Sequence, residues 1–366
     1  MWSRRISIFA VTVAVATATV GPTAPPALAG WPDEPIVADV NGDGRPDRNM
    51  LGAAPGTSGC VVRVELGRPG GGYGPAQSYP YLSSAEYCPD MGVGLDLDSD
   101  AADELVVTWF AGPPPSIDDT LLLLDGFRVI HGFRTIWQPS YIGTADFNGD
   151  GRQDVYEWTD QGDGFATYLA TTGGTLVPGP VRYCSGRPQY QLADFDADGA
   201  MDVAIAYVEG CGAYFTGVVV VLDDGTVVDL RGDVHGDDFW TVSVADVNND
   251  GFPDVLTTSD VTGARNVFVG TGTGTFRPAP TAIRDNAQIS AVRATGIRVL
   301  ANDFATSTTR VSIVSRPAHG TVQVTTGGTI VYRPHAGHRA RSDRFVYRLS
   351  EAGRTSNAAV SLRLTR

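Results

Sequence analysis

Five short segments of the chain place oxygen-bearing side chains at the same spacing. Each has Asp at position 1, Asp or Asn at position 3, Asp at position 5 and an acid at position 9. These first to fifth loops begin at Asp39, Asp96, Asp146, Asp194 and Asp246. Alternate side chains of a tightly turning loop can point at one centre, and calcium is a hard cation that takes about six to eight oxygen ligands. The spacing therefore predicts one calcium site in each loop.

Position 6 of each loop has to bend the backbone around the ion, and glycine permits the positive φ that this bend requires. Four loops have glycine at this position, whereas the second loop has Ala101. We therefore expect the second site to be the weakest, although Asp103 and Glu104 add negative charge to it.

The EF-hand begins with the same D-x-N-x-D-G pattern, but it also needs a bidentate Glu at position 12 and flanking helices. Position 12 of the five loops reads Met50, Val107, Glu157, Ile205 and Thr257. Only one of these is Glu, and the residues that follow each loop are β-branched and aromatic rather than helix-forming. The pattern therefore excludes an EF-hand.

Short strands must hold these loops, because apolar runs such as LVVTW and VAIAY follow them and hairpin-like stretches come next. The loops begin 57, 50, 48 and 52 residues apart. A period of about fifty residues is typical of a four-stranded propeller blade. We predict an all-β fold containing a β-propeller of about five four-stranded blades. Each blade would run strand, acidic loop, strand, turn, strand, strand.

The loops and their strands, over roughly residues 35–282, resemble the FG-GAP/VCBS repeats of integrin-α-type propellers. The resemblance implies that each loop joins two neighbouring strands of a blade and holds one calcium ion. Carried over by position, the implied ligands are Asp39, Asn41, Asp43, Asp47, Asp96, Asp98, Asp100, Glu104, Asp146, Asn148, Asp150, Asp154, Asp194, Asp196, Asp198, Asp202, Asp246, Asn248, Asp250 and Asp254. The family commonly has seven blades, but the five motifs in this chain lead us to predict five.

The acidic loops stop after Pro280, and short alternating strands predict a small β-sandwich over residues 283–366. The segments V-L-A-N-D, P-A-H-G-T-V and G-G-T-I-V-Y-R-P resemble bacterial Ig-like and cadherin-like modules. Family members often carry an acidic run after the A-N-D. Residues Phe304 to Ser307 replace that run in this chain, so we assign no calcium to the module.

The first 29 residues have the pattern of a signal peptide: Arg4 and Arg5, a short apolar run, and the small-residue cleavage pattern that ends at Ala29. A membrane anchor is the alternative, but the apolar run is too short to span a bilayer comfortably. We therefore expect a secreted protein with no transmembrane segment, whose propeller occupies residues 30–282. Cell-surface association stays open.

Four cysteines in an exported chain indicate two disulfides, for which three pairings are possible. Cys88 and Cys184 each lie shortly before a loop motif, which favours bonds between neighbours along the chain. We predict the pairs Cys60–Cys88 and Cys184–Cys211.

The charge of the chain is divided unevenly between its two predicted domains. Residues 30–282 carry 12 Arg and 37 acids, a formal charge of −25, whereas residues 283–366 carry 13 Arg and 4 acids, a charge of +9. A propeller this acidic is not expected to bind nucleic acid. Clustered carboxylates instead favour cation binding, and the arginine-rich domain suits an anionic cell-wall or matrix polymer.

The sequence contains no convincing catalytic constellation. Its five histidines have no metal-ligand spacing, and there is no G-x-S-x-G motif. We therefore interpret the chain as a secreted calcium-binding propeller that acts as an extracellular binding or adhesion module, with an extracellular protein or glycan as ligand. The alternative is a secreted carbohydrate-active enzyme or lectin in which calcium is structural.

Overall fold

The computed structural model describes residues 33–365 except positions 111, 114–120, 137, 160–163, 186–188, 211–212, 231–238, 248–249, 262, 264, 279, 304, 306–308 and 352–353. The predicted signal peptide, residues 1–29, therefore lies outside the described residues. Within them, no helix is long and apolar enough to span a membrane. The helical structure in this part of the chain is a single 3₁₀ turn at Val299–Ala301.

Five four-stranded antiparallel sheets follow one another along the chain, and in each sheet the strands lie in chain order. The strands are β1 (Ile36–Ala38), β2 (Asp47–Ala53), β3 (Cys60–Glu65) and β4 (Gln77–Leu82); β5 (Met91–Leu95), β6 (Glu104–Thr108), β7 (Leu121–Asp125) and β8 (Arg128–Phe133); β9 (Tyr141–Ala145), β10 (Asp154–Trp158), β11 (Phe165–Ala170) and β12 (Leu176–Tyr183); β13 (Gln189–Ala193), β14 (Asp202–Gly210), β15 (Ala213–Val221) and β16 (Val227–Asp229); β17 (Trp240–Ala245), β18 (Asp254–Ser259), β19 (Arg265–Gly270) and β20 (Phe276–Pro278). The predicted all-β fold with five four-stranded blades is confirmed.

Successive sheets pack face to face through apolar side chains, which explains the continuous apolar runs in the sequence. In β6, Leu105 and Val107 belong to the core shared with the first sheet, whereas Val106 belongs to the core shared with the third. Similar cores join the third sheet to the fourth and the fourth to the fifth. A strand that is buried on both faces needs apolar residues at consecutive positions rather than at alternate ones.

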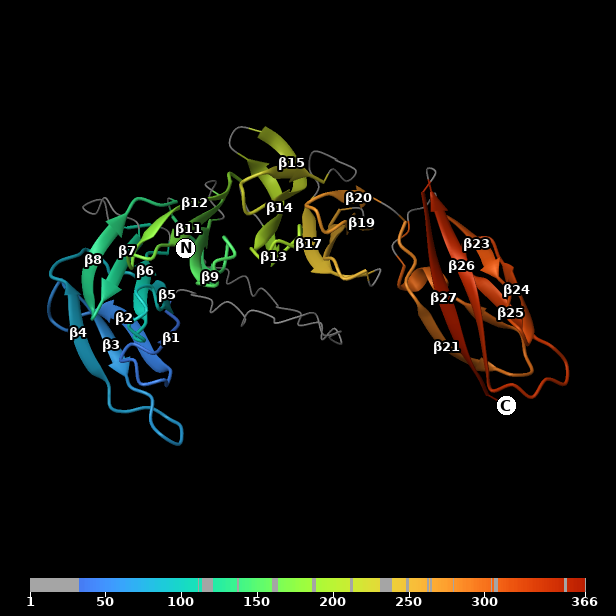
Figure 1. Ribbon diagram of the computed structural model, residues 1–366, viewed down its shortest axis with the longest axis horizontal. Helices are drawn as coiled ribbons and strands as arrows, with labels where there is room; N and C mark the ends of the chain where they lie inside the picture. Colours follow the sequence, from blue (N-terminus) through green and yellow to red (C-terminus); the bar gives the residue numbers. More distant parts are fainter. Residues whose placement is uncertain are drawn as a thin grey trace, which may run out of the picture.

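The five sheets form an arc that does not close into a ring (Figure 1). The first strands of neighbouring sheets contact each other, β1 with β5, β5 with β9 and β13 with β17. Gly94 permits the first of these approaches, because a Cβ at this position would lie 2.2 Å from the Cβ of Ala38. Sheet β1–β4 and sheet β17–β20 lie at opposite ends of the arc, and in the described part of the chain no apolar core joins them.

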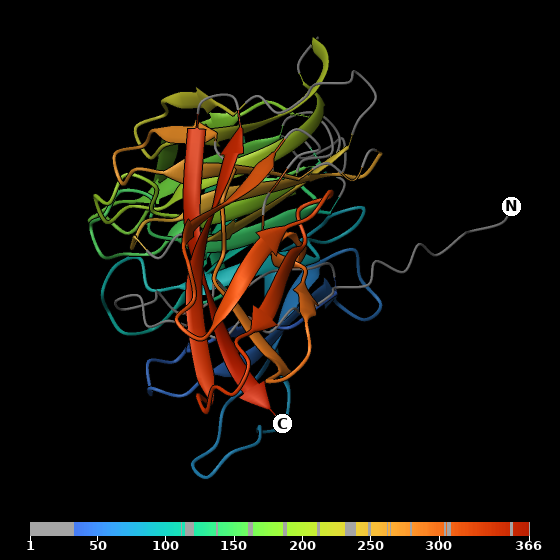
Figure 2. The same ribbon diagram turned by 90° about the vertical axis from the view of Figure 1, so that its right-hand side faces the viewer.

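The C-terminal residues form two further sheets that pack on each other, as expected for a small sandwich. One sheet has the order β21 (Asp285–Ser290), β27 (Arg354–Thr365), β26 (Ser342–Glu351) and β23 (Arg310–Ser315). The other has the order β22 (Thr295–Ile297), β25 (Ile330–Pro334) and β24 (Gly320–Val324). Their shared core includes Tyr332, Phe345, Tyr347 and Val360. Figure 2 shows this module facing the viewer.

Cys60 and Cys88 form a disulfide across 28 residues of sequence, which is the predicted local pairing. It ties β3 of the first sheet to the segment that leads into β5. Cys184 is also disulfide-bonded. Its expected partner, Cys211, lies outside the described residues, so that pairing stays a prediction.

Glu157 in β10 is an acid outside the nine positions of the loop motif, and its side chain is fully buried. Neither of its carboxyl oxygens makes a hydrogen bond of good geometry. Burial raises the pKa of Glu157 to about 8. Groups near the carboxyl lower its pKa, but by less than burial raises it; they are the hydroxyls of Thr135, Thr108 and Tyr168 and the charge of Arg182. The folded chain therefore carries Glu157 protonated at neutral pH.

We expect Glu157→Gln to change the pH dependence of stability. The ordinary pKa of 4.5 applies to the unfolded chain, so between this value and about 8 only the unfolded state releases the proton. The free energy of unfolding of the wild type therefore falls across this window. The variant should gain about 1.4 kcal/mol per pH unit relative to the wild type within the window, and should gain nothing below it.

Urea unfolding of both proteins below, within and above this pH window measures the effect. A constant difference between the variant and the wild type at every pH would contradict a buried, protonated Glu157.

Candidate metal centres

The five acidic loops occupy the same place in every sheet, namely the connection from the first strand to the second. This is the position that the sequence pattern predicts. Loops of neighbouring sheets also touch each other. The amide of Asp103 donates to the carbonyl of Asp39, and the amide of Met201 donates to the carbonyl of Asp146, both at 2.8 Å.

The backbone at position 6 is left-handed in all five loops. Its φ values are 78° at Gly44, 75° at Ala101, 84° at Gly151, 98° at Gly199 and 94° at Gly251. A Cβ at any of the four glycines would meet no atom within 4 Å, so the conformation, rather than crowding, selects glycine. The second loop adopts the same conformation with alanine, at an energetic cost.

Position 4 is also left-handed in the four loops in which it is described, at Gly42, Ser99, Gly149 and Ala197. Sequence reasoning missed this feature because the residue type at this position varies from loop to loop. The two left-handed residues turn the loop tightly enough for its side chains to bond its own amides.

The carboxylate at position 1 organises this turn by accepting the amide of position 6. The distances are 2.6 Å for Asp39–Gly44, 2.8 Å for Asp146–Gly151, 3.0 Å for Asp194–Gly199 and 3.0 Å for Asp246–Gly251. Side chains at positions 3 and 5 accept amides two residues ahead, as Asp98 does from Asp100 and Asp100 from Ala102. The oxygens that make these bonds therefore turn toward the inside of their loops.

The acid at position 9 is buried in every loop, and in the four loops where it is Asp it forms a clasp within the sheet. Asp154 accepts the amide of Phe147 at 2.8 Å and the amide of Ala170 at 2.7 Å. Asp47, Asp202 and Asp254 make the equivalent pair of bonds. Each position-9 Asp therefore joins the start of its loop to the far end of the third strand of the sheet.

Burial raises the pKa values of these acids, and the carboxylates of the same loop raise them further. The pKa reaches about 6 for Asp154 and Asp254, and about 7 for Glu104 and Asp202. Bonds from the backbone amides lower these pKa values but do not offset burial. A bound cation would favour the charged form of each group.

The second and fourth loops bring their acids close enough to share one ion. In the second, one oxygen each from Asp96, Asp98 and Glu104 lie within 4.8 Å of one another. Asp194, Asp196 and Asp202 do the same in the fourth loop. In addition, Asp196 Oδ1 is buried with no hydrogen-bond partner. An all-oxygen donor set with an unsatisfied buried oxygen fits a hard divalent cation.

The fourth loop has a further acid that sequence reasoning missed. One oxygen of Asp223, in the turn from β15 to β16, lies within 4.8 Å of oxygens of Asp196 and Asp198. The second amide of each clasp comes from the end of the third strand. In the first, third, fourth and fifth sheets it belongs to Gly67, Ala170, Asp223 and Gly270, respectively. Among these four residues Asp223 alone is an acid, so the repeat could not reveal it.

The first and third loops have Asn at position 3 and Arg at position 7. Arg45 forms an ion pair with Asp43, and Arg152 pairs with Asp150 at 2.6 Å. The hydrogen bond from Arg152 lowers the pKa of Asp150. An ion in either loop would therefore compete with this arginine for the position-5 carboxylate.

In the fifth loop, Asp246 and Asp254 make the bonds described above. Asn248 lies outside the described residues. The hydrogen bonds of the loops describe their shape but do not test metal binding, so the twenty predicted ligands stay predictions.

We expect Ala101→Gly to stabilise the chain by about 1 kcal/mol, because it removes the strain of a left-handed alanine. It should also strengthen calcium binding at the second loop. Ala102→Gly is the matched control, because Ala102 is not left-handed. Replacing this alanine with glycine should lower the stability of the chain slightly. Thermal melts and calcium titrations of both variants check this. Equal effects of the two substitutions would contradict the account of position 6.

Five stacked four-stranded sheets with an acidic loop after each first strand define a propeller-type repeat protein with a C-terminal sandwich. Comparison with protein families agrees: residues 239–275 match the FG-GAP repeat, and residues 277–363 match a bacterial Ig domain. The resemblance seen in the sequence is confirmed for both. These domain types are typical of extracellular binding and adhesion proteins. No curated protein matches the chain.

Proposed function

We propose that the chain is a secreted calcium-binding propeller that serves as an extracellular binding or adhesion module, and that its calcium is structural. The observation that carries this proposal is the convergence of three carboxylates within 4.8 Å in the second and fourth loops. The other three loops share the spacing of these acids and the same place in the sheet.

Calcium would act by fixing the connection between the first and second strands of each blade. The position-9 acid already ties this connection to the third strand, so an ion that binds the loop also braces the clasp. The unfolded chain presents no such cluster, and an ion that binds only the folded state stabilises it. The loops would then present a rigid surface to an extracellular protein or glycan.

The two domains differ enough in charge to have different partners. The acidic propeller, at −25, suits calcium-dependent ligands, whereas the C-terminal module, at +9, suits an anionic cell-wall or matrix polymer. Attachment through the module would leave the propeller free to bind its own ligand.

The test is binding of the labelled mature chain, residues 30–366, to an array of glycans and extracellular proteins, with calcium and with chelator. We expect binding to at least one class of ligand that is lost in chelator. It should weaken in a variant with Asp194→Ala and Asp196→Ala in the fourth loop. Binding that is identical with and without calcium would contradict the structural role of the ion, and turnover of an arrayed glycan would favour an enzyme.

A further inference from the structure

One face of the C-terminal module gathers arginines without any acid. In the sheet β21-β27-β26-β23, alternate residues point into the core, among them Val311, Tyr347 and Leu362. The residues between them point outward and include four arginines: Arg310 on β23, Arg344 and Arg348 on β26, and Arg363 on β27. None of the outward-facing described residues of this sheet is acidic.

The four acids of the module lie elsewhere, so they do not neutralise this face. Asp285, Asp303 and Asp343 are buried. Asp303 accepts a hydrogen bond from the hydroxyl of Tyr347. Asp343 accepts hydrogen bonds from the hydroxyl of Tyr332 and from the amides of Ala318 and His319. Glu351 is held by Thr309 at the end of β26. The guanidinium groups of Arg344 and Arg363 have no ion-pair partner among the described residues.

Strand register places hydrogen-bonding side chains beside these arginines. Arg344 lies opposite Ser361, which in turn lies opposite Asn286. Arg363 lies opposite Gln288 on one side. Arg348 lies further along β26. Its Nε donates a hydrogen bond to Oδ1 of Asn357 at 2.9 Å, which orients the guanidinium group.

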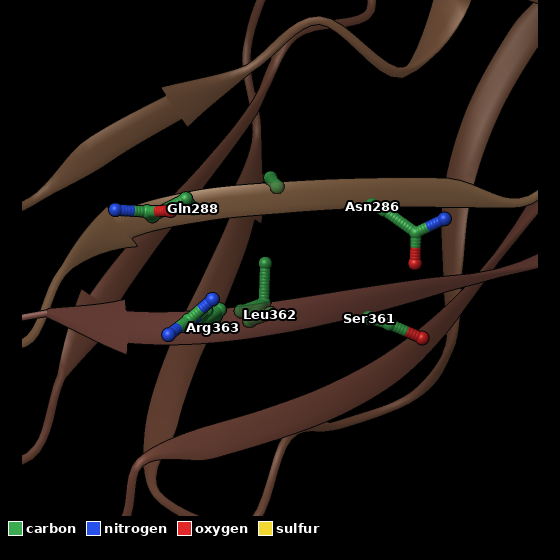
Figure 3. A pocket seen from close by; sticks show the side chains of 6 residues that line it. Asn286, Gln288, Ser361, Leu362 and Arg363 are labelled. Carbon is green, nitrogen blue, oxygen red and sulfur yellow. The ribbon is translucent and has the colours of Figure 1, made fainter.

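A hollow of about 370 Å³ lies on the β21 and β27 side of this face. Asn286 and Ser361 line one end of it, and Gln288 and Arg363 line the other (Figure 3). Amide and hydroxyl side chains next to a guanidinium are the groups that bind sugar hydroxyls and a nearby anion together.

We propose that this arginine face, defined by Arg310, Arg344, Arg348 and Arg363, binds a linear acidic polysaccharide. Arg344 and Arg348 are four residues apart on one strand, so their positions are about 13 Å apart. Arginines spaced along and across the sheet can pair with successive anionic groups of one polymer strand, while the neighbouring polar side chains bond its hydroxyls. A neutral glycan would leave the guanidinium groups unpaired.

This inference names a partner for the binding function proposed above and in that sense rests on it. It involves no acidic loop, however, so the two can fail separately. Loss of calcium binding would leave the arginine face intact, and loss of the arginine face would leave the calcium sites intact.

The experiment uses the full mature chain and end-labelled hyaluronan oligosaccharides, with carboxyl-reduced oligosaccharides of the same length as the neutral control. Fluorescence anisotropy measures binding across a salt series. We expect the wild type to bind the acidic form, to lose affinity as salt rises, and to ignore the neutral form. The double variant R344Q/R363Q should bind at least about tenfold more weakly, because it removes both unpaired guanidinium groups.

The matched control is R298Q/R333Q, which removes the same charge beside the other sheet, where both arginines are exposed. It should change affinity less than about twofold, and both double variants should melt at nearly the same temperature as the wild type.

Equal weakening by the two variants would overturn the proposal, because overall charge would then explain binding. Tighter binding of a single-stranded oligonucleotide of equal charge would also overturn it. So would a wild-type dimer in sedimentation that R344Q/R363Q abolishes, since a second copy would then occupy the face.

Discussion

Chelation of calcium will lower the melting temperature of the mature chain, and calcium, unlike magnesium, will restore it. The folded second and fourth loops each bring three carboxylates together, whereas the unfolded chain separates them, so we expect calcium to bind the folded state. At free calcium about 100 times the dissociation constant, each site adds about 2.7 kcal/mol. Magnesium keeps most of its water and demands a more regular geometry, so it should restore little.

Calorimetric melts in chelator, in calcium and in magnesium measure this effect. The C-terminal module is an internal control, because it has none of the predicted calcium loops and its core should unfold independently of calcium. An unchanged propeller transition in chelator would contradict calcium as a structural ion.

Asp154→Ala will destabilise the propeller by about 2–6 kcal/mol even in chelator. The carboxylate is fully buried and accepts the amides of Phe147 and Ala170. Its removal leaves both buried amides without a partner, and each unsatisfied group costs about 1–3 kcal/mol. The effect of this substitution therefore does not require an ion.

Asp150→Ala is the matched control in the same loop. Asp150 is exposed and pairs with Arg152 at the surface, so in chelator its loss should cost less than about 1 kcal/mol. With calcium, both variants should lose the ion of the third loop. Urea unfolding in chelator separates the two roles, and equal costs for Asp150→Ala and Asp154→Ala would contradict the clasp.

The blade plan could be predicted from the sequence because each blade repeats it. The strands after the second and fourth loops contain short apolar runs, as in Leu105 to Val107, and such a run predicts a strand buried on both faces. The position of the loops followed from the same repeat. The open arc could not be predicted, because closure depends on how each pair of sheets packs, for example at Gly94 against Ala38.

The parts of the site that the sequence did not reveal depend on contacts between distant residues. Asp223 lies 21 residues after Asp202, and the pairing of β14 with β15 brings it to the fourth loop. The buried clasp likewise depends on an amide at the end of a third strand. In the C-terminal module, the excess of arginine is visible in the sequence. The placement of Arg344, Arg348 and Arg363 on one face depends on the register of β26 with β27.

Counting the calcium ions bound per chain tests the central claim most directly. Isothermal titration calorimetry of the chelator-treated mature chain should give about five ions per chain, one for each loop. A variant with Asp194→Ala and Asp196→Ala in the fourth loop should bind one fewer. Absence of stoichiometric binding at millimolar free calcium, or an unchanged count in that variant, would show that the repeated acidic loops are not calcium sites.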